Sequence, residues 1–131
     1  MTLFKDGDDP KARLDVVEQL TEVEKLVQIA CSDDSPRVRL VAVSRISEDD
    51  ALMNVVRDAR ELDVRLVAVE RISSEQSIAD IARDPRNLDL IGMCFSRITD
   101  RKIIEAIAED TSCSKVARRM AVEHYADESY L

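Results

Sequence analysis

The chain has 131 residues, which is enough for one domain with its own hydrophobic core but too few for two independent domains. Aromatic residues make up 3% of it, Trp is absent and there are two glycines, a composition poor in the residues that β-sandwiches and barrels use. The formal net charge of −8 disfavours a surface for nucleic acid or anionic membranes, because both partners attract an excess of Lys and Arg. We therefore expect a helical domain that binds neither.

The N-terminus and the cysteines indicate a compartment. The first residues, Met1 to Asp6, contain neither the basic nor the apolar stretch of a signal peptide, and every uncharged run is far shorter than the ~20 residues of a membrane span. The cysteines are three in number and widely spaced, which favours neither a disulfide framework nor a metal site. The sequence predicts a cytoplasmic protein with reduced thiols.

The predicted elements recur at a fixed spacing. After a polar segment over residues 1–8, Asp9-Pro10 predicts a helix start, because Asp is a good N-cap and Pro suits the first helical position. Ser35-Pro36 repeats this signal 26 residues later, and residues 38–46 and 64–72 share the pattern Val-Arg-Leu-Val-Ala-Val-Xaa-Arg-Ile. Related segments lie at residues 12–20, 90–98 and 117–125. A fixed period of this length is typical of repeat proteins.

A second helix is predicted after each of the first four segments. Each begins with a hydroxyl residue that can act as N-cap, namely Thr21, Ser47, Ser73 and Thr99. Glu24 and Gln76 would complete capping boxes with Thr21 and Ser73. Apolar residues then recur at i, i+3 and i+4, so one face of each second helix should be buried. We expect five first helices and four second helices, in repeats over about 9–34, 35–60, 61–86, 87–113 and 114–131, the last truncated to one helix.

The repeated motif, followed by a second helix that ends in Ile-Ala-Arg-Asp-Pro at residues 81–85, resembles short HEAT repeats of the phycobilin-lyase type. The resemblance covers residues 9–126. It implies an all-α fold, in which the helix pairs stack as a right-handed α-solenoid (an α-α superhelix) in a single domain over residues 9–131. The chain also resembles the leucine-rich repeat variant family, which has similarly short helical units, but it lacks the N-terminal cysteine cluster known in that family.

The resemblance implies a structural ladder. HEAT-like units commonly pair aspartates with arginines inside the stack, and the matching positions here are Asp58, Asp84 and Asp110, and Arg13, Arg39, Arg65 and Arg118. The helical wheel places Arg39 toward the core, where an unpaired charge would be costly. We expect ion pairs that support the fold and do not bind a ligand.

Catalytic and metal-binding patterns are missing from the sequence. His124 is the only histidine, and although Asp127 and Glu128 follow it closely, it falls on the predicted solvent face of the last helix. Ser and Cys are scattered, no glycine-rich loop is present, and no two carboxylates pair on a predicted apolar face. We expect no enzyme activity, no cofactor and no metal.

The exposed face of the second helices is the candidate binding site, because this face lines the concave groove in HEAT-like arrays. The candidate residues are Val27, Gln28, Met53, Asn54, Arg57, Ala79, Asp80 and Arg83. The apolar members form a modest anchor and the arginines a charged rim, a pattern that suits a peptide or helix. An ordinary solvated face is an equal alternative. A further column on the outer face of the first helices, Arg45, Arg71 and Arg97, is interpreted as weak surface ion pairs.

Three classes of function follow from this pattern. A monomeric protein-interaction or scaffold module that binds a protein or peptide is preferred, because a solenoid offers an extended surface without a closed pocket. The alternative is a cofactor-handling accessory factor similar to HEAT-like phycobilin lyases, which would need a deep polar groove. A nucleic-acid binder ranks last, since it would need a basic groove.

Overall fold

The computed structural model describes residues 9–129, with side chains up to residue 126. Within that range the chain consists of nine α-helices and one 3-10 helix joined by short connections, without a strand, so the all-α prediction is confirmed. The helices are α1 Pro10–Gln19, α2 Val23–Ser32, α3 Pro36–Ser44, α4 Asp49–Asp58, α5 Leu62–Arg71, α6 Glu75–Arg83, η1 Pro85–Leu90, α7 Ile91–Arg97, α8 Arg101–Glu109 and α9 Lys115–Ser129. The predicted segment 1–8 and the end of the last repeat at 130–131 lie outside the described residues. None of the described helices is long and apolar enough to cross a membrane.

The odd-numbered helices correspond to the predicted first helices, and two of them begin at the predicted signals. The Asp9 carboxylate accepts a hydrogen bond from the Ala12 amide, and the Ser35 hydroxyl accepts one from the Val38 amide. In both helices Pro fills the first helical position, where its missing amide proton costs no hydrogen bond. These two caps are confirmed.

The even-numbered helices begin one residue later than predicted. Their N-caps are Glu22, Glu48, Ser74 and Asp100, so the proposed capping boxes that start at Thr21 and Ser73 are wrong. The physical reason lies in the preceding turns: a buried isoleucine, Ile46, Ile72 or Ile98, anchors the connection before α4, α6 and α8, and the half-buried Leu20 occupies the same position before α2. The chain stays extended for the following residues, and the N-cap position moves past the hydroxyl residue.

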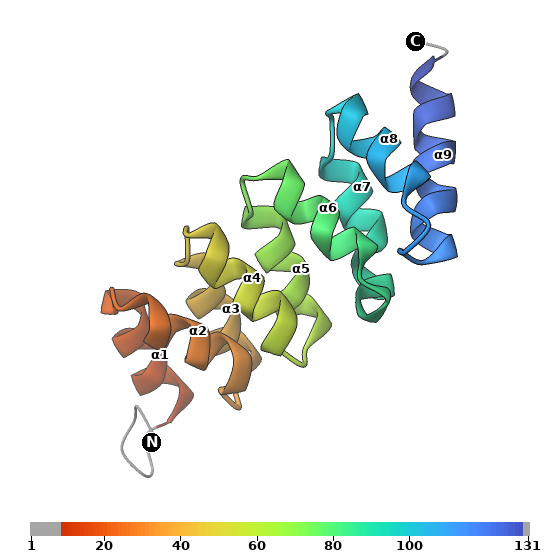
Figure 1. Cartoon of the computed structure of the whole chain (residues 1–131). Helices are drawn as coiled ribbons and strands as arrows, with labels where there is room; N and C mark the ends of the chain where they lie inside the picture. Colours follow the sequence, from red (N-terminus) through yellow and green to blue (C-terminus); the bar gives the residue numbers. More distant parts are fainter. Residues whose placement is uncertain (1–8, 130–131) are drawn as a thin grey trace. The chain divides into compact units, whose positions relative to one another are not determined.

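The chain divides into two compact units, the first ending at Arg71 and the second beginning at Ile72. In the first unit α1, α3 and α5 pack side by side, α2 packs beside α4, and each of these even-numbered helices packs against the odd-numbered helix that follows it (Figure 1). The core between the two rows contains Val38, Ile46, Leu52 and Val55, all almost fully buried. The predicted apolar stripe of α4, at Leu52, Val55 and Val56, is therefore confirmed.

In the second unit α6 packs beside α8, α7 packs beside α9, and α8 packs most closely against α9 (Figure 1). The predicted helix over residues 90–98 starts only at Ile91, because the chain first forms the 3-10 helix η1. Asp84 begins η1 by accepting a hydrogen bond from the Arg86 amide, and the buried Asn87 has the non-helical angles φ −107° and ψ 30°. The Asn87 side-chain amide donates to the Ile81 carbonyl at 3.3 Å, which ties η1 to α6.

Three arginines at the ends of odd-numbered helices each reach back one repeat. Arg45 donates to the Leu20 carbonyl at 2.9 Å, Arg71 to the Ile46 carbonyl at 2.9 Å, and Arg97 to the Ile72 carbonyl at 2.8 Å, each time 25 residues earlier. We call Arg45, Arg71 and Arg97 the arginine series. Each acceptor follows the last residues of a helix or begins the next connection, where carbonyls lack an intrahelical partner. The interpretation of this column as surface ion pairs missed these backbone contacts.

A carboxylate from one helix also caps another in the second unit. Glu75, the first residue of α6, accepts hydrogen bonds from the backbone amides of Thr99 and Asp100 and from the Thr99 hydroxyl, at the start of α8. These amide donors favour the ionised form and hold the pKa of Glu75 below its ordinary value of 4.5. Glu75 thus satisfies amides that precede α8 and joins the two even-numbered helices.

Replacing Glu75 by glutamine should lower the free energy of unfolding by about 1 kcal/mol at neutral pH, because the amide loses the charge that strengthens these hydrogen bonds. Since the folded-state pKa is depressed, the stabilisation is present above the ordinary value of 4.5 and is lost as the pH falls through the folded-state pKa. Urea unfolding at neutral and acidic pH should therefore show the wild type and the variant converging in acid. Glu105→Gln, an exposed change on α8, is the control, and a difference for Glu75→Gln that does not change with pH would contradict the capping role.

Candidate interaction site on the even-numbered helices

The predicted groove residues lie on α2, α4 and α6, as expected, but they differ in exposure. Gln28, Arg57 and Asp80 are exposed, and Val27, Met53, Asn54 and Arg83 are half-buried. Ala79 is fully buried, so its assignment to a partner-binding surface is wrong. The reason is that α6 buries a broad face, which includes Ile78, Ala79, Ile81 and Ala82.

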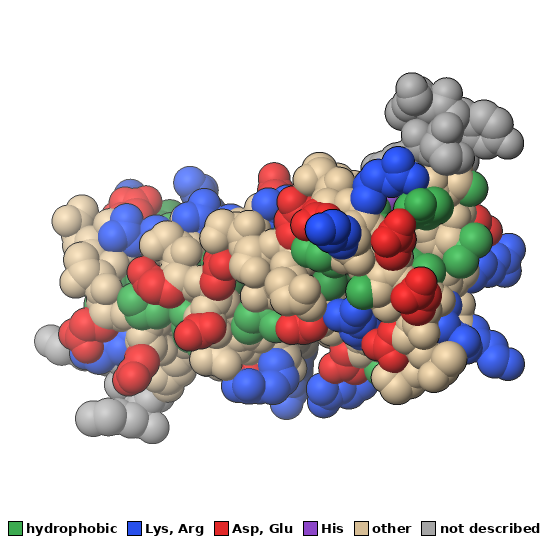
Figure 2. Space-filling model, turned by 45° about the horizontal axis from the view of Figure 1, so that its top comes forward, with side chains coloured by type: hydrophobic (Ala, Val, Ile, Leu, Met, Phe, Trp, Pro, Cys, Tyr) green, Lys and Arg blue, Asp and Glu red, His purple; other side chains and the backbone are tan. Residues whose placement is uncertain are grey.

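A depression of about 410 Å³ lies between α2 and α4 in the first unit. We call it the α2–α4 cavity, and its lining residues are Val23, Glu24, Val27, Glu48, Asp50, Ala51 and Asn54. Val27 and Asn54 belong to the predicted site, so the structure brings two of its members together at one cavity. On the face that Figure 2 presents, acidic side chains lie beside apolar ones over the N-terminal helices.

The local sequence explains why this cavity combines apolar and acidic groups. Val27 and Ala51 each neighbour a leucine of the core, Leu26 or Leu52, and so lie at the edge of the buried stripe. The acids occupy the start of each helix, with Glu24 in the first turn of α2 and Asp50 in that of α4. Negative side chains are favoured there because the helix dipole places partial positive charge at the N-terminus.

The acidic side chains of the α2–α4 cavity remain open to solvent. Glu24, Glu48 and Asp50 are all exposed. Glu48 accepts a hydrogen bond from the Ser47 hydroxyl at 3.1 Å. Within the described residues, Glu24 and Asp50 have neither an ion pair nor a side-chain hydrogen bond. Their charge is therefore available to a partner.

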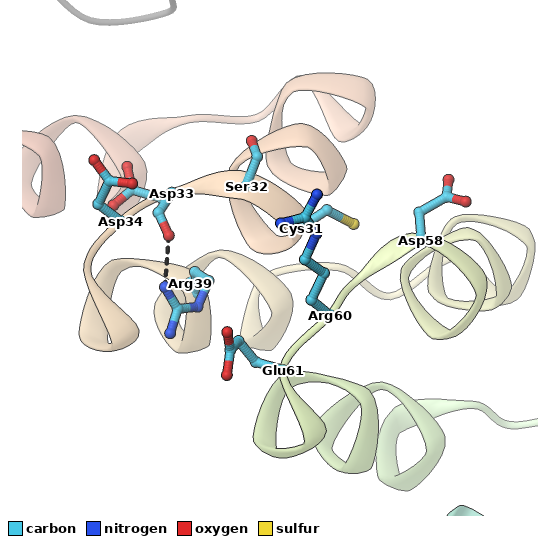
Figure 3. Close-up of a pocket in the computed structure, with 8 residues that line it drawn as sticks. All are labelled: Cys31, Ser32, Asp33, Asp34, Arg39, Asp58, Arg60 and Glu61. Atoms are coloured by element: carbon cyan, nitrogen blue, oxygen red, sulfur yellow. Dashed lines mark hydrogen bonds between the residues drawn. The ribbon is translucent and has the colours of Figure 1, made fainter.

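A larger cavity of about 530 Å³ lies near the C-terminal ends of α2 and α4 in the same unit (Figure 3). Its lining residues are Cys31, Ser32, Asp33, Asp34, Arg39, Asp58, Arg60 and Glu61. Arg39 donates to the backbone carbonyl of Asp33 at 2.6 Å, the contact drawn in Figure 3. The Asp33 carboxylate lies 3.0 Å from Nε of Arg13. Acidic and basic groups largely neutralise each other around this second cavity.

The predicted pairing of the aspartate row with the arginine row is wrong. Each of the three aspartates pairs with an arginine outside the predicted row, Asp58 with Arg57 at 3.0 Å, Asp84 with Arg86 at 2.7 Å and Asp110 with Arg83 at 3.0 Å.

Two arginines of the predicted row, Arg39 and Arg65, donate to backbone carbonyls at helix ends instead. Arg39 donates to the carbonyl of Asp33, the C-cap residue of α2, and Nε of Arg65 donates to the Val56 carbonyl in the last turn of α4 at 3.3 Å. Such carbonyls lack an intrahelical donor and carry the negative end of the dipole, which suits a guanidinium. Arg13 pairs with Asp33, and Arg118 lies half-buried on α9.

Cys31, which lines the larger cavity, and Cys94 on α7 are poor nucleophiles. Burial, with a smaller effect of the Asp58 charge, raises the pKa of Cys31 to about 11, and burial raises that of Cys94 to about 12. A thiol with such a pKa is almost fully protonated at neutral pH, whereas the thiolate is the reactive form. The cavity that Cys31 lines therefore lacks an activated sulfur.

Metal-binding groups do not converge within the described side chains. No cluster of three or more His, Cys, Asp or Glu residues there could hold a metal ion. The His124 ring lies 6.0 Å from that of Phe95, centroid to centroid. Asp127 and Glu128, considered with His124 in the sequence, lie outside the described side chains.

The cavity residues outside the predicted candidate set are Val23, Glu24, Glu48, Asp50 and Ala51. Glu24 and Asp50 occupy the same register of two successive repeats and fall on the predicted exposed face of the second helices, but they were not selected as candidate binding residues. Comparison with protein-family models, with curated proteins and with solved structures finds no match to this chain.

Proposed function

We propose that this chain is a protein-interaction or scaffold module, monomeric and non-catalytic, that binds a protein or peptide partner on the exposed face of its even-numbered helices. In this proposal the helix pairs of both units belong to a right-handed α-solenoid of HEAT-like repeats. The observation that carries the proposal is the α2–α4 cavity, which joins half-buried Val27 to exposed carboxylates whose charges are not neutralised locally. An apolar centre with a polar rim is the usual anatomy of a protein-binding surface.

Two further observations support binding of a protein and not chemistry on a small molecule or on nucleic acid. The high pKa values of Cys31 and Cys94 disfavour a cysteine nucleophile. The net charge of −8 opposes attraction to phosphate backbones. The three free thiols suit a reducing compartment, and we propose the cytoplasm.

The proposal can be tested by selecting peptides from a random display library on the immobilised full chain. Val27→Arg/Asn54→Arg fills the α2–α4 cavity with two long side chains. Gln19→Arg/Ser44→Arg places the same charge on exposed positions of α1 and α3 and is the matched control. We expect selected peptides to lose at least about tenfold in affinity for the cavity variant and to bind the control like the wild type.

Circular dichroism melting of both variants shows whether each remains folded. The proposal is overturned if the library yields no enriched peptide. It is equally overturned if the enriched peptides bind the folded cavity variant as tightly as the wild type.

A further inference from the structure

We infer that the α2–α4 cavity recognises a basic amphipathic segment of a partner protein, in which Lys or Arg side chains contact the carboxylates and an aliphatic side chain enters between the helices. This inference rests on the proposed function and adds the chemistry of the partner. Both the charge and the shape of the cavity support it.

The charge of the cavity has one sign. Three of its lining residues are carboxylates, Glu24, Glu48 and Asp50, and none of the described lining residues is basic. The neighbouring Lys25 is directed to Glu22, with its amino group 3.1 Å from that carboxylate, and Arg57 is paired with Asp58 at 3.0 Å. The cations next to the cavity are thus occupied by other acids, and the field at the rim attracts a positive group.

The larger cavity of the same unit provides an internal comparison. Four acids line it, but Arg39 and Arg60 line it too, and its Asp33 is paired with Arg13. An incoming cation there would compete with arginines of the chain itself. At the α2–α4 cavity Glu24 and Asp50 have no such competitor within the described residues, so an external cation gains the full attraction.

The shape of the cavity suits an aliphatic side chain flanked by those cations. Val23 and Val27 are half-buried and Ala51 is 8% exposed, so methyl groups form the deepest part. The volume of about 410 Å³ lies within the ~300–1,000 Å³ range of ligand sites. A depression between two packed helices is the geometry into which an amphipathic helix places side chains at i, i+3 and i+4. Such a helix places Lys or Arg one turn away from a central Leu or Ile, so its cations can reach the carboxylates at the rim while the aliphatic side chain enters the cavity.

The test uses three fluorescently labelled peptides of about 15 residues with one helical pattern. The first peptide, called Lys/Leu, has Leu on one face of the helix and Lys on the other. The second peptide has Glu in place of every Lys, and the third has Ser in place of every Leu. Binding to the full chain is followed by fluorescence anisotropy at several salt concentrations. We expect the Lys/Leu peptide to bind at least about tenfold more tightly than either of the others, with an affinity that falls as salt rises.

Two variants with equal charge changes locate the binding. Glu24→Gln/Asp50→Asn removes two of the three carboxylate charges of the cavity with little change in side-chain size, and should weaken binding of the Lys/Leu peptide about tenfold. Glu18→Gln/Glu109→Gln removes the same charge from exposed residues that do not line the cavity and should leave the affinity within about twofold of the wild type.

The outcomes separate this inference from the proposed function. If the two neutralised variants lose affinity equally, or if the Glu/Leu peptide binds as well as the Lys/Leu peptide, the inference is overturned. If library peptides depend on Val27 and Asn54 but contain no Lys or Arg, the proposed function stands and the basic partner is wrong. If no peptide responds to Val27→Arg/Asn54→Arg, the proposed function itself fails.

Discussion

Replacing Leu52 by alanine should lower the free energy of unfolding by about 3 kcal/mol. Leu52 is fully buried on α4, the helix that packs against both α2 and α5. The substitution removes apolar atoms from a close-packed site and leaves a cavity that its neighbours can fill only in part. Urea unfolding followed by far-UV circular dichroism measures the loss, which should appear as a lower midpoint with an unchanged slope.

Leu62→Ala is the matched control, because it makes the same chemical change in the same unit at a leucine that is 44% exposed. Its cost should stay below about 1 kcal/mol, since most of that side chain is in contact with water in the folded state. Equal losses for the two variants would mean that α4 does not bury the predicted face. A loss for Leu52→Ala that is confined to part of the transition would instead show that the two units unfold separately.

Replacing Asp33 by alanine should cost about 2 kcal/mol. Its carboxylate is 6% exposed, lies 3.0 Å from Nε of Arg13, and also accepts the Ser35 amide at 2.9 Å. Arg13 is itself only 15% exposed, so the variant leaves a largely buried guanidinium without this carboxylate. The turn between α2 and α3 loses a hydrogen bond as well. Thermal and urea unfolding should both register the loss.

The exposed pair of Arg57 and Asp58 provides the comparison. Its side chains are 59% and 51% exposed, and Asp58→Ala should change stability by less than about 0.5 kcal/mol because water screens such pairs. The double variant Asp33→Ala/Arg13→Met should regain part of the loss, since it also removes the largely buried guanidinium that has lost this carboxylate. If Asp33→Ala were as mild as Asp58→Ala, the burial of the Arg13 pair would be refuted.

The helices could be predicted because their signals are local. Asp9-Pro10 and Ser35-Pro36 cap helices through neighbouring amides, and the stripe at Leu52, Val55 and Val56 follows from the helical period. The starts of the even-numbered helices were misplaced by one residue because a buried connector such as Ile46 decides how long the chain stays extended. The burial of such a connector depends on tertiary packing, and a local capping pattern carries no information about tertiary packing.

The candidate site was predictable only in part for a related reason. Val27 and Asn54 could be assigned to the right face from the helical wheel, but the burial of Ala79 depends on what packs over α6. The acids Glu24 and Asp50 have two compatible roles, because a residue at a helix N-terminus can stabilise that helix and still present its charge to a partner. Sequence reasoning placed both acids on the exposed face of the second helices but selected only their apolar, amide and other charged neighbours as binding residues.

The arginine series has a consequence for how such a chain can grow and diverge. Each member, for example Arg71, binds the main chain of residue Ile46 and not its side chain, so the acceptor is present whatever amino acid occupies that position. A duplicated repeat would bring its own donor and would find an acceptor in the repeat before it, without any compensating substitution. The contact therefore places no requirement on the side chain at the acceptor position, which answers only to its own packing, and the contact between repeats is inherited with the donor.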